Sequence, residues 1–221
     1  AKAVVFNWAG LFLRALGRLR EAAQPMQAAN EMVAKNKDWK NAASGVGTLS
    51  ELYLTLGEVE AAVAAARQSV EFADRSGDIF QRMLNRAKMA DKIHQSGEIL
   101  EADQLFNEAD AMQKKMQPEY PQLYSLQGFL FCDLLLAQGK AQEVLERAKQ
   151  TLEWVSRAGL DILSSALDRL SLGRAYLLEA LNEKPQRSQR PLRFEKATDY
   201  LNQAVTGLRE AGTQHHLPQG L

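Results

Sequence analysis

The sequence predicts an all-α fold in which helical hairpins stack into an α-solenoid. Three observations favour this fold class. Apolar residues recur every three or four positions along most of the 221 residues, which is the spacing of helices with one buried face. Single glycines recur at Gly17, Gly57, Gly97 and Gly139, with a period of about 40 to 42 residues. Side chains at fixed distances from these joint glycines match in size, so the chain contains about five copies of one two-helix unit.

The repeated unit is clearest from Thr48 to Asp78, where Gly57 joins two amphipathic helices. Positions four residues before a joint glycine are bulky, as at Tyr53 and Ile93. Positions seven before, five after and twelve after are small or modest in size. Small side chains let two helices cross closely, while bulky ones fill the space between hairpins. The small positions are Gly10, Ser50, Ala90 and Cys132; Ala22, Ala62, Ala102 and Val144; and Ala29, Ser69, Ala109 and Thr151.

We expect at least nine helices, arranged in five pairs within a single domain. The expected helices run over about residues 2–16 and 18–35, 41–56 and 58–75, 79–96 and 98–116, 121–137 and 140–157, and 161–182 and 193–211. The corresponding repeats are 2–37, 38–77, 78–117, 118–159 and 160–212 of a domain that spans 1–221. In the first helix we expect five residues to face inward, namely Val5, Phe6, Ala9, Leu13 and Leu16. Because the helical pattern is already present at the first residues, we expect the chain to be a piece of a longer protein.

Helix starts and stops follow from glycine, proline and capping residues. Pro25 predicts a kink or a late start in the second helix, since proline removes a backbone hydrogen bond. Gly77 is suited to a left-handed helix stop, and Asp78 with Gln81 forms a potential capping box for the next helix. Pro121 suits the first turn of the helix that runs to Ala137.

The fifth pair contains an insertion. About 12 extra residues, around NEKPQRSQRPLR, separate its two helices, and this polar segment predicts a flexible surface loop from Asn182 to Arg193. In the last helix we expect an inward face made of Ala197, Leu201, Ala204 and Leu208.

The repeat pattern resembles the tetratricopeptide repeat (TPR), most clearly at Leu172, Gly173 and Tyr176 in LSLGRAYLLEAL. The period is longer than the one usual for that repeat, which is about 34 residues, and this suggests longer helices. Four segments resemble the C-terminal repeats of bacterial signal-transducing (STAND or NACHT-type) NTPases: NWAGLFLRALGRLREAAQPMQ, LSELYLTLGEVEAAVAAARQSVEFADRSGD, QPEYPQLYSLQGFLFCDLLLAQG and AVTGLREAGTQHHLPQGL. The TPR resemblance implies that the α-solenoid is right-handed. The resemblance to the NTPases implies a nucleotide-binding domain upstream and a further repeat that begins at HHLP.

Composition excludes several classes of function. The chain has 27 basic and 27 acidic residues, so it lacks the basic excess of a nucleic-acid-binding protein. It has no apolar run of about 18 residues that could span a membrane. The single cysteine, Cys132, excludes an internal disulfide and fits a reducing compartment, so we expect a cytoplasmic protein.

No catalytic, cofactor or metal site emerges from the motifs. The chain has no G-x-x-x-x-G-K-[ST] phosphate loop. His94, His215 and His216 lack further ligands at metal-binding spacing, and Cys132 is better explained as a packing thiol than as a nucleophile. The three tryptophans, Trp8, Trp39 and Trp154, are better explained by core or edge packing than by a ligand cage. We therefore expect no enzyme activity and no cofactor.

One group of polar residues could bind a partner. Glu51, Asp91 and Asp133 each stand six residues before a joint glycine. In TPR arrays the first helix of each pair lines the concave surface, so these acids would form a ridge there and favour a basic partner. The other candidates on this surface are Asn7, Arg14, His94, Gln95 and Arg174. The simpler alternative is a solvated face, because exposed acids are common on helices.

These features favour a non-catalytic module that binds a protein or peptide partner on a preformed surface, in the service of a signalling NTPase. The alternative is a regulatory domain that senses a small molecule or a short peptide. A deep pocket lined by convergent polar groups would favour sensing, whereas an open groove would favour docking.

Overall fold

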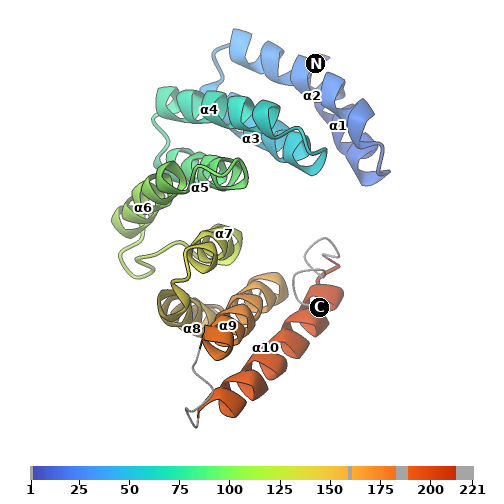
Figure 1. The fold of residues 1–221 in the computed structure, drawn as a ribbon. Helices are drawn as coiled ribbons and strands as arrows, with labels where there is room; N and C mark the ends of the chain where they lie inside the picture. The colour runs from blue at the N-terminus through green and yellow to red at the C-terminus, as the bar shows by residue number, and fades with distance from the viewer. Residues whose placement is uncertain (1, 159–160, 183–188, 213–221) are drawn as a thin grey trace. The chain divides into compact units, whose positions relative to one another are not determined.

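The computed structural model describes residues 2–158, 161–182 and 189–212, and over these ranges the chain forms ten α-helices and no strand (Figure 1). The helices follow one another as hairpins, in the order predicted. Their bounds are α1 Lys2–Ala15, α2 Leu19–Lys35, α3 Trp39–Thr55, α4 Val59–Ser76, α5 Ile79–Gln95, α6 Ile99–Met116, α7 Ser125–Ala137, α8 Ala141–Ala158, α9 Ile162–Asn182 and α10 Arg190–Glu210.

The chain divides into two compact units, Ala1–Pro121 and Gln122–Leu221. Unit 1 contains α1 to α6 as three hairpins. In this unit each helix packs on its neighbours in the chain, and α3 also contacts α5. Unit 2 contains the hairpins α7–α8 and α9–α10, in which α9 packs against α7, α8 and α10. Each unit therefore has first helices of consecutive hairpins in contact, α3 with α5 and α7 with α9.

The joints between paired helices share one backbone motif. Gly57 has a left-handed φ of 77°, and its N–H donates to the Leu54 carbonyl at 2.9 Å. The following N–H, that of Glu58, donates to the Tyr53 carbonyl, also at 2.9 Å. This pair of bonds is a Schellman motif, which needs a residue with positive φ at its centre. The same motif occurs at the other joint glycines, whose φ angles are 72° at Gly17, 93° at Gly97 and 75° at Gly139.

A further Schellman motif lies between the first two hairpins, and the residue with positive φ at its centre is not a glycine. Lys37 has a φ of 59°, its N–H donates to the Ala34 carbonyl, and the Asp38 N–H donates to the Val33 carbonyl. The predicted stop at Gly77 is also left-handed, with a φ of 69°. Asp78 then caps α5, because its side chain accepts a hydrogen bond from the Gln81 N–H at 2.9 Å. The capping box also predicted that the Gln81 side chain would accept a hydrogen bond from the Asp78 N–H. The Ser76 hydroxyl accepts that hydrogen bond instead.

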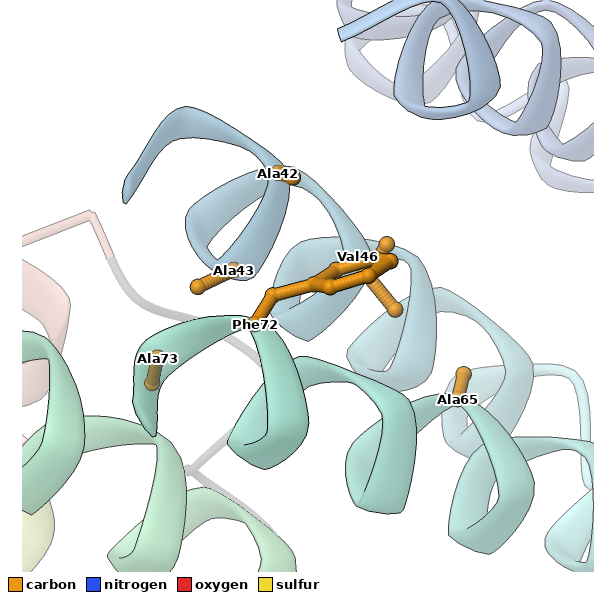
Figure 2. Close-up of a cluster of buried hydrophobic side chains, with 6 residues drawn as sticks. All are labelled: Ala42, Ala43, Val46, Ala65, Phe72 and Ala73. Carbon is orange, nitrogen blue, oxygen red and sulfur yellow. The ribbon is translucent and has the colours of Figure 1, made fainter. Parts of the chain in front are cut away.

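The positions predicted to be small lie at close helix crossings. Figure 2 shows the arrangement in the second hairpin, where Phe72 of α4 lies across Val46 of α3 and alanines from both helices line the contact. Ala22, Ala62, Ala102 and Val144 are all fully buried, which confirms the predicted packing of that position. In unit 2 the core joins α7, α9 and α10 through Phe129, Leu167, Leu170, Ala204 and Leu208.

The predicted inward face of the first helix is wrong for three residues. Val5 is 67% exposed, Phe6 37% and Leu16 72%, and Gly10 is the buried residue of α1. Ala9 and Leu13 are half-buried. The reason is that α1 packs mainly on α2, so its opposite face has no neighbour among the described residues.

Two predictions about prolines need correction. The second helix starts at Leu19 and includes Pro25, so the predicted late start is wrong. Pro121 does not lie in the first turn of α7, which begins at Ser125. In the segment between Pro121 and α7, the Leu123 side chain is buried. The Leu123 carbonyl oxygen lies only 2.6 Å from the point where a Cβ on Gly128 would stand, so this segment packs against α7 before the helix begins.

The loop between the two helices of the fifth pair is shorter than predicted. Asn182 ends α9, and α10 starts at Arg190 with Pro191 in its first turn, so the ends of the expected loop are helical. Residues 183–188 of that loop lie outside the described residues, as do Gly159, His215 and His216.

Candidate partner-binding surface

The predicted site residues all lie on the first helices of the hairpins. They are Asn7 and Arg14 on α1, Glu51 on α3, Asp91, His94 and Gln95 on α5, Asp133 on α7 and Arg174 on α9. Their exposure differs. Asn7 and Gln95 are exposed, Asp91 is buried, and the others are half-buried.

In unit 1 the carboxylate of Glu51 is paired with a lysine of the next hairpin. Lys88 Nζ on α5 lies 2.8 Å from Glu51 Oε1, and the two side chains are 15% and 33% exposed. The pair therefore connects the first helices of adjacent hairpins at a position that solvent reaches only in part. A partner that uses Glu51 has to compete with Lys88.

Asp91 is not displayed to solvent, so its expected exposure is wrong. Its Oδ2 accepts a hydrogen bond from Lys92 Nζ at 2.8 Å, and the side chains of both residues are at most 8% exposed. Packing between the hairpins covers both groups, and the opposite charges compensate each other. Removing one charge would leave the other buried without its partner, which is costly.

The first helices α3 and α5 approach closely because α3 has a glycine at the contact. A Cβ on Gly47 would stand 2.6 Å from Asn85 Oδ1. The amide of Asn85 is fixed by donating to the Gln81 carbonyl at 2.9 Å and to Gln81 Oε1 at 3.1 Å. The hydrogen bonds between Asn85 and Gln81 and the ion pair between Glu51 and Lys88 therefore hold the polar side chains at the α3–α5 contact in place.

In unit 2 two of the predicted site residues bind each other. Arg174 on α9 lies 2.6 Å from Asp133 on α7, and both are partly exposed. A second ion pair, Arg193 to Glu179 at 3.4 Å, joins α10 to α9. Arg174 is therefore the ion-pair partner of Asp133.

Sequence reasoning missed Lys88 and Lys92. Lys88 follows Glu51 by nearly one repeat period, and Arg174 follows Asp133 by about the same distance along the chain. Opposite charges about one period apart would have indicated ion pairs between first helices of adjacent hairpins. Lys92 offered no comparable signal, because its burial depends on the hairpins packed around it.

Each unit also has an open groove. In unit 1 the α4–α5 groove, about 600 Å³ in volume, includes the predicted residue Gln95. Its lining is Val59, Glu60, Val63, Ala64, Arg67, Ile93, Gln95, Ser96 and Glu98. In unit 2 a groove of about 710 Å³ lies between the end of α8, the start of α9 and the second half of α10, with Asp161, Arg169 and Gln203 among its polar residues.

The described residues contain no group of three His, Cys, Asp or Glu side chains that could hold a metal ion. Cys132 is buried, and burial raises the pKa of its thiol to about 12, so it is a packing residue and a poor nucleophile. Within the same ranges, none of the helices has the length and apolar character that a membrane span requires.

The tryptophans differ in their packing. Trp39 stacks on Phe72 with ring centroids 5.6 Å apart, and Trp154 meets Tyr124 edge-on at 6.5 Å. Trp8 stacks on Phe12 at 5.8 Å, yet it remains 54% exposed. Packing at the core or its edge therefore describes the first two, while Trp8 lies on the open face of α1.

Comparison with solved structures shows the fold. One similar structure is a single-residue variant of nearly identical TPR-like repeats from a Podosopora anserina protein described as a kinesin light chain, with 17% identity, a TM-score of 0.65, and coverage of 94% of this chain and 95% of that one. The unsubstituted form gives 17% identity, a TM-score of 0.63, and coverage of 95% and 96%.

A third similar structure is the Signal Transduction ATPase with Numerous Domains (STAND) protein with a tetratricopeptide repeat sensor from Pyrococcus horikoshii. It shares 15% identity and a TM-score of 0.69, and the alignment covers 99% of this chain and 31% of that one. No protein-family model and no curated protein matches the chain. The likeness confirms the predicted fold class, an α-solenoid of TPR-like hairpins.

Proposed function

We propose that the chain is a non-catalytic interaction module that binds a protein or peptide partner in the α4–α5 groove of unit 1. The observation that carries this proposal is the form of the groove. It is open to solvent, and its lining includes the apolar residues Val59, Val63 and Ala64 along α4. Open, mixed surfaces suit an extended or helical segment of another protein better than an enclosed small molecule.

The charges around the groove favour a basic partner. Glu60 and Glu98 are exposed carboxylates of the lining. Arg67 is the cation of this lining, and its guanidinium already lies 2.7 Å from Glu101 Oε1. The field within the groove is therefore negative on balance, which speeds association with cationic segments.

A binding experiment with charge-reversed variants tests this assignment. The chain is immobilised, a bound partner is isolated and identified, and its affinity is measured for the wild type and for Glu60→Lys with Glu98→Lys. We expect the double variant to lose binding and the wild-type affinity to fall with salt. Glu71→Lys is the matched control, since Glu71 is an exposed acid of α4 outside the groove. Equal affinities for all three proteins would exclude the groove as the binding site.

We also propose that the half-exposed acids of the predicted ridge bind cationic groups, each within its own unit. In unit 1 Glu51 would exchange Lys88 for a cationic group of a partner, and in unit 2 Asp133 would exchange Arg174. Glu51→Gln with Asp133→Asn should then weaken binding while helicity stays unchanged. Asp91 is left out of this variant because it is buried with Lys92.

We also propose that the module serves a signalling NTPase in the cytoplasm. Support comes from the similarity to the repeat-bearing STAND protein, of which this chain covers 31%. Partner binding would shift the switch equilibrium of such an NTPase only if the partner prefers one of its states. The parent polypeptide should then carry a phosphate loop upstream, and its complete sequence tests this directly.

The alternative function is the sensing of a small molecule in the groove of unit 2. Polar groups converge there, and Arg169 Nε donates to Gln203 Oε1 at 3.0 Å. A screen of metabolites by thermal shift tests the alternative. A ligand that raises the melting temperature of the wild type but not of Arg169→Ala would favour sensing over docking.

A further inference from the structure

The open face of α1, which lies away from α2, carries several large apolar side chains that are exposed. It exposes Trp8 at 54%, Phe12 at 62% and Leu16 at 72%, next to Val4 and Val5. Exposed apolar residues gathered on one helix face mark an interaction site. The repeats themselves show what covers the equivalent face elsewhere in the chain.

Phe12 stands five residues before its joint glycine, and the equivalent positions in the next two hairpins of unit 1 are Leu52 and Lys92. Those two residues are 1% and 3% exposed. Even a lysine is covered at this position. This position is therefore covered in hairpins that follow another hairpin, and it is exposed at Phe12, where no preceding hairpin is present among the described residues.

The contact that covers it is visible between the first two hairpins. Leu49 and Leu52 of α3 form one buried cluster with Ala22 and Met26 of α2. Between these two hairpins the second helix of the first thus covers the first helix of the second, using a small residue five positions after the joint glycine and a methionine four positions later. By the same register, the open face of α1 fits the second helix of another hairpin.

Two positions on α1 differ from the residues that form the α3–α5 ion pair, and they specify this occupant further. Trp8 takes the position of Lys88, nine residues before the joint, where the other internal hairpins have Thr48 and Leu130, and Leu11 takes the position of Glu51, six before it. In the internal contact Lys88 reaches back to Glu51 of the preceding hairpin, at 2.8 Å. Where Trp8 replaces that lysine, an acid in the preceding hairpin would lose its cation.

We propose that α1 stacks against one more hairpin of the same repeat type, placed ahead of it in the polypeptide, whose first helix carries an apolar residue where α3 carries Glu51. The stacking buries Phe12 under the second helix of that hairpin. Trp8 meets the apolar residue of its first helix, in place of the ion pair between Glu51 and Lys88.

A grafted hairpin tests the stacking. A copy of residues 38–80 fused ahead of Ala1 places the copied joint glycine before Gly17 at the same spacing that separates Gly57 from Gly97. Every Trp39 and Trp154 is replaced by Phe, so that Trp8 is the fluorescent reporter. We expect the graft to shift Trp8 emission to the blue, to protect it from acrylamide and to raise the melting temperature. A graft that leaves these quantities unchanged, or remains unfolded by circular dichroism, overturns the proposal, because a repeat hairpin is stable only when stacked.

Variants within the graft test the specific contacts. Changing the copied Glu51 to Leu should raise the melting temperature further, whereas Glu51→Leu at the native position removes the ion pair with Lys88 and should not. Phe12→Glu should abolish the gain from the graft, and the control Ala15→Glu should retain it, since Thr55, Gln95 and Ala137 are exposed at the same position. Equal effects of both substitutions would contradict the register.

Sedimentation of the chain without the graft tests the other occupant, a second copy. We expect a monomer at all concentrations. Association that Phe12→Glu abolishes would overturn the proposal and assign the face to a homodimer.

Discussion

Asp168→Asn should stabilise unit 2 at neutral pH and leave it almost unchanged in mild acid. Asp168 lies on α9 and is 4% exposed. Its Oδ1 accepts a hydrogen bond from the Thr151 hydroxyl at 2.7 Å, and its Oδ2 has no hydrogen-bond partner. Burial raises the pKa of this carboxyl from 3.8 to about 7, against the smaller lowering by the Thr151 hydrogen bond and by the charge of Arg169.

The sign and size of the effect follow from proton linkage. Between about pH 4 and pH 7 the folded state holds a proton that the unfolded state releases, so the free energy of unfolding falls as pH rises. A shift of roughly 3 pKa units corresponds to about 4 kcal/mol at most, at 1.36 kcal/mol per unit. Asparagine copies the protonated acid and can still accept from Thr151. The difference between variant and wild type should therefore grow from near zero at pH 4 to a few kcal/mol at pH 8.

Urea unfolding at several pH values measures this difference. Trp154 of unit 2 is the reporter, in a background where Trp8 and Trp39 are replaced by Phe, and the variant and wild type are compared from pH 4 to pH 8. Asp199→Asn is the matched control, because Asp199 is an exposed acid of α10 in the same unit. Parallel stability curves for Asp168→Asn and wild type would refute the reasoning, because they would show that the carboxylate ionises in the folded state without cost.

Three further substitutions test the packing and are measured by thermal or urea unfolding followed by circular dichroism. Ala62→Leu should cost roughly 1 to 3 kcal/mol, since Ala62 is fully buried at a helix crossing, and an unchanged melting temperature would contradict that placement. Gly47→Ala should also destabilise, because its Cβ would stand 2.6 Å from the buried Asn85 Oδ1, and a gain would mean that Asn85 can move aside. Lys37→Gly should stabilise by about 0.5 to 1 kcal/mol, because it relieves a left-handed φ of 59° in a non-glycine residue, and a loss would show that the lysine side chain matters more than the backbone.

The repeat period and the hairpin joints could be predicted from the sequence alone. Gly57 and its equivalents were recognisable because a Schellman motif demands a residue that tolerates positive φ, and glycine does so at least cost. Ala62 and its equivalents were recognisable because close helix crossings exclude large side chains in every repeat. The joint at Lys37 escaped notice because its residue type is not glycine, although it stands midway between Gly17 and Gly57.

Tertiary structure alone decided how the polar residues of the candidate surface are used. A carboxylate six residues before the joint looks the same in sequence at Glu51, Asp91 and Asp133, yet each has a different partner and exposure. Likewise, Phe12 and Leu52 occupy equivalent helical positions, and one is exposed while the other is buried. The physical reason is that a local pattern fixes which way a side chain points from its helix. Its burial and its charge partner are set by the neighbouring hairpin, whose side chains come from residues about one repeat away.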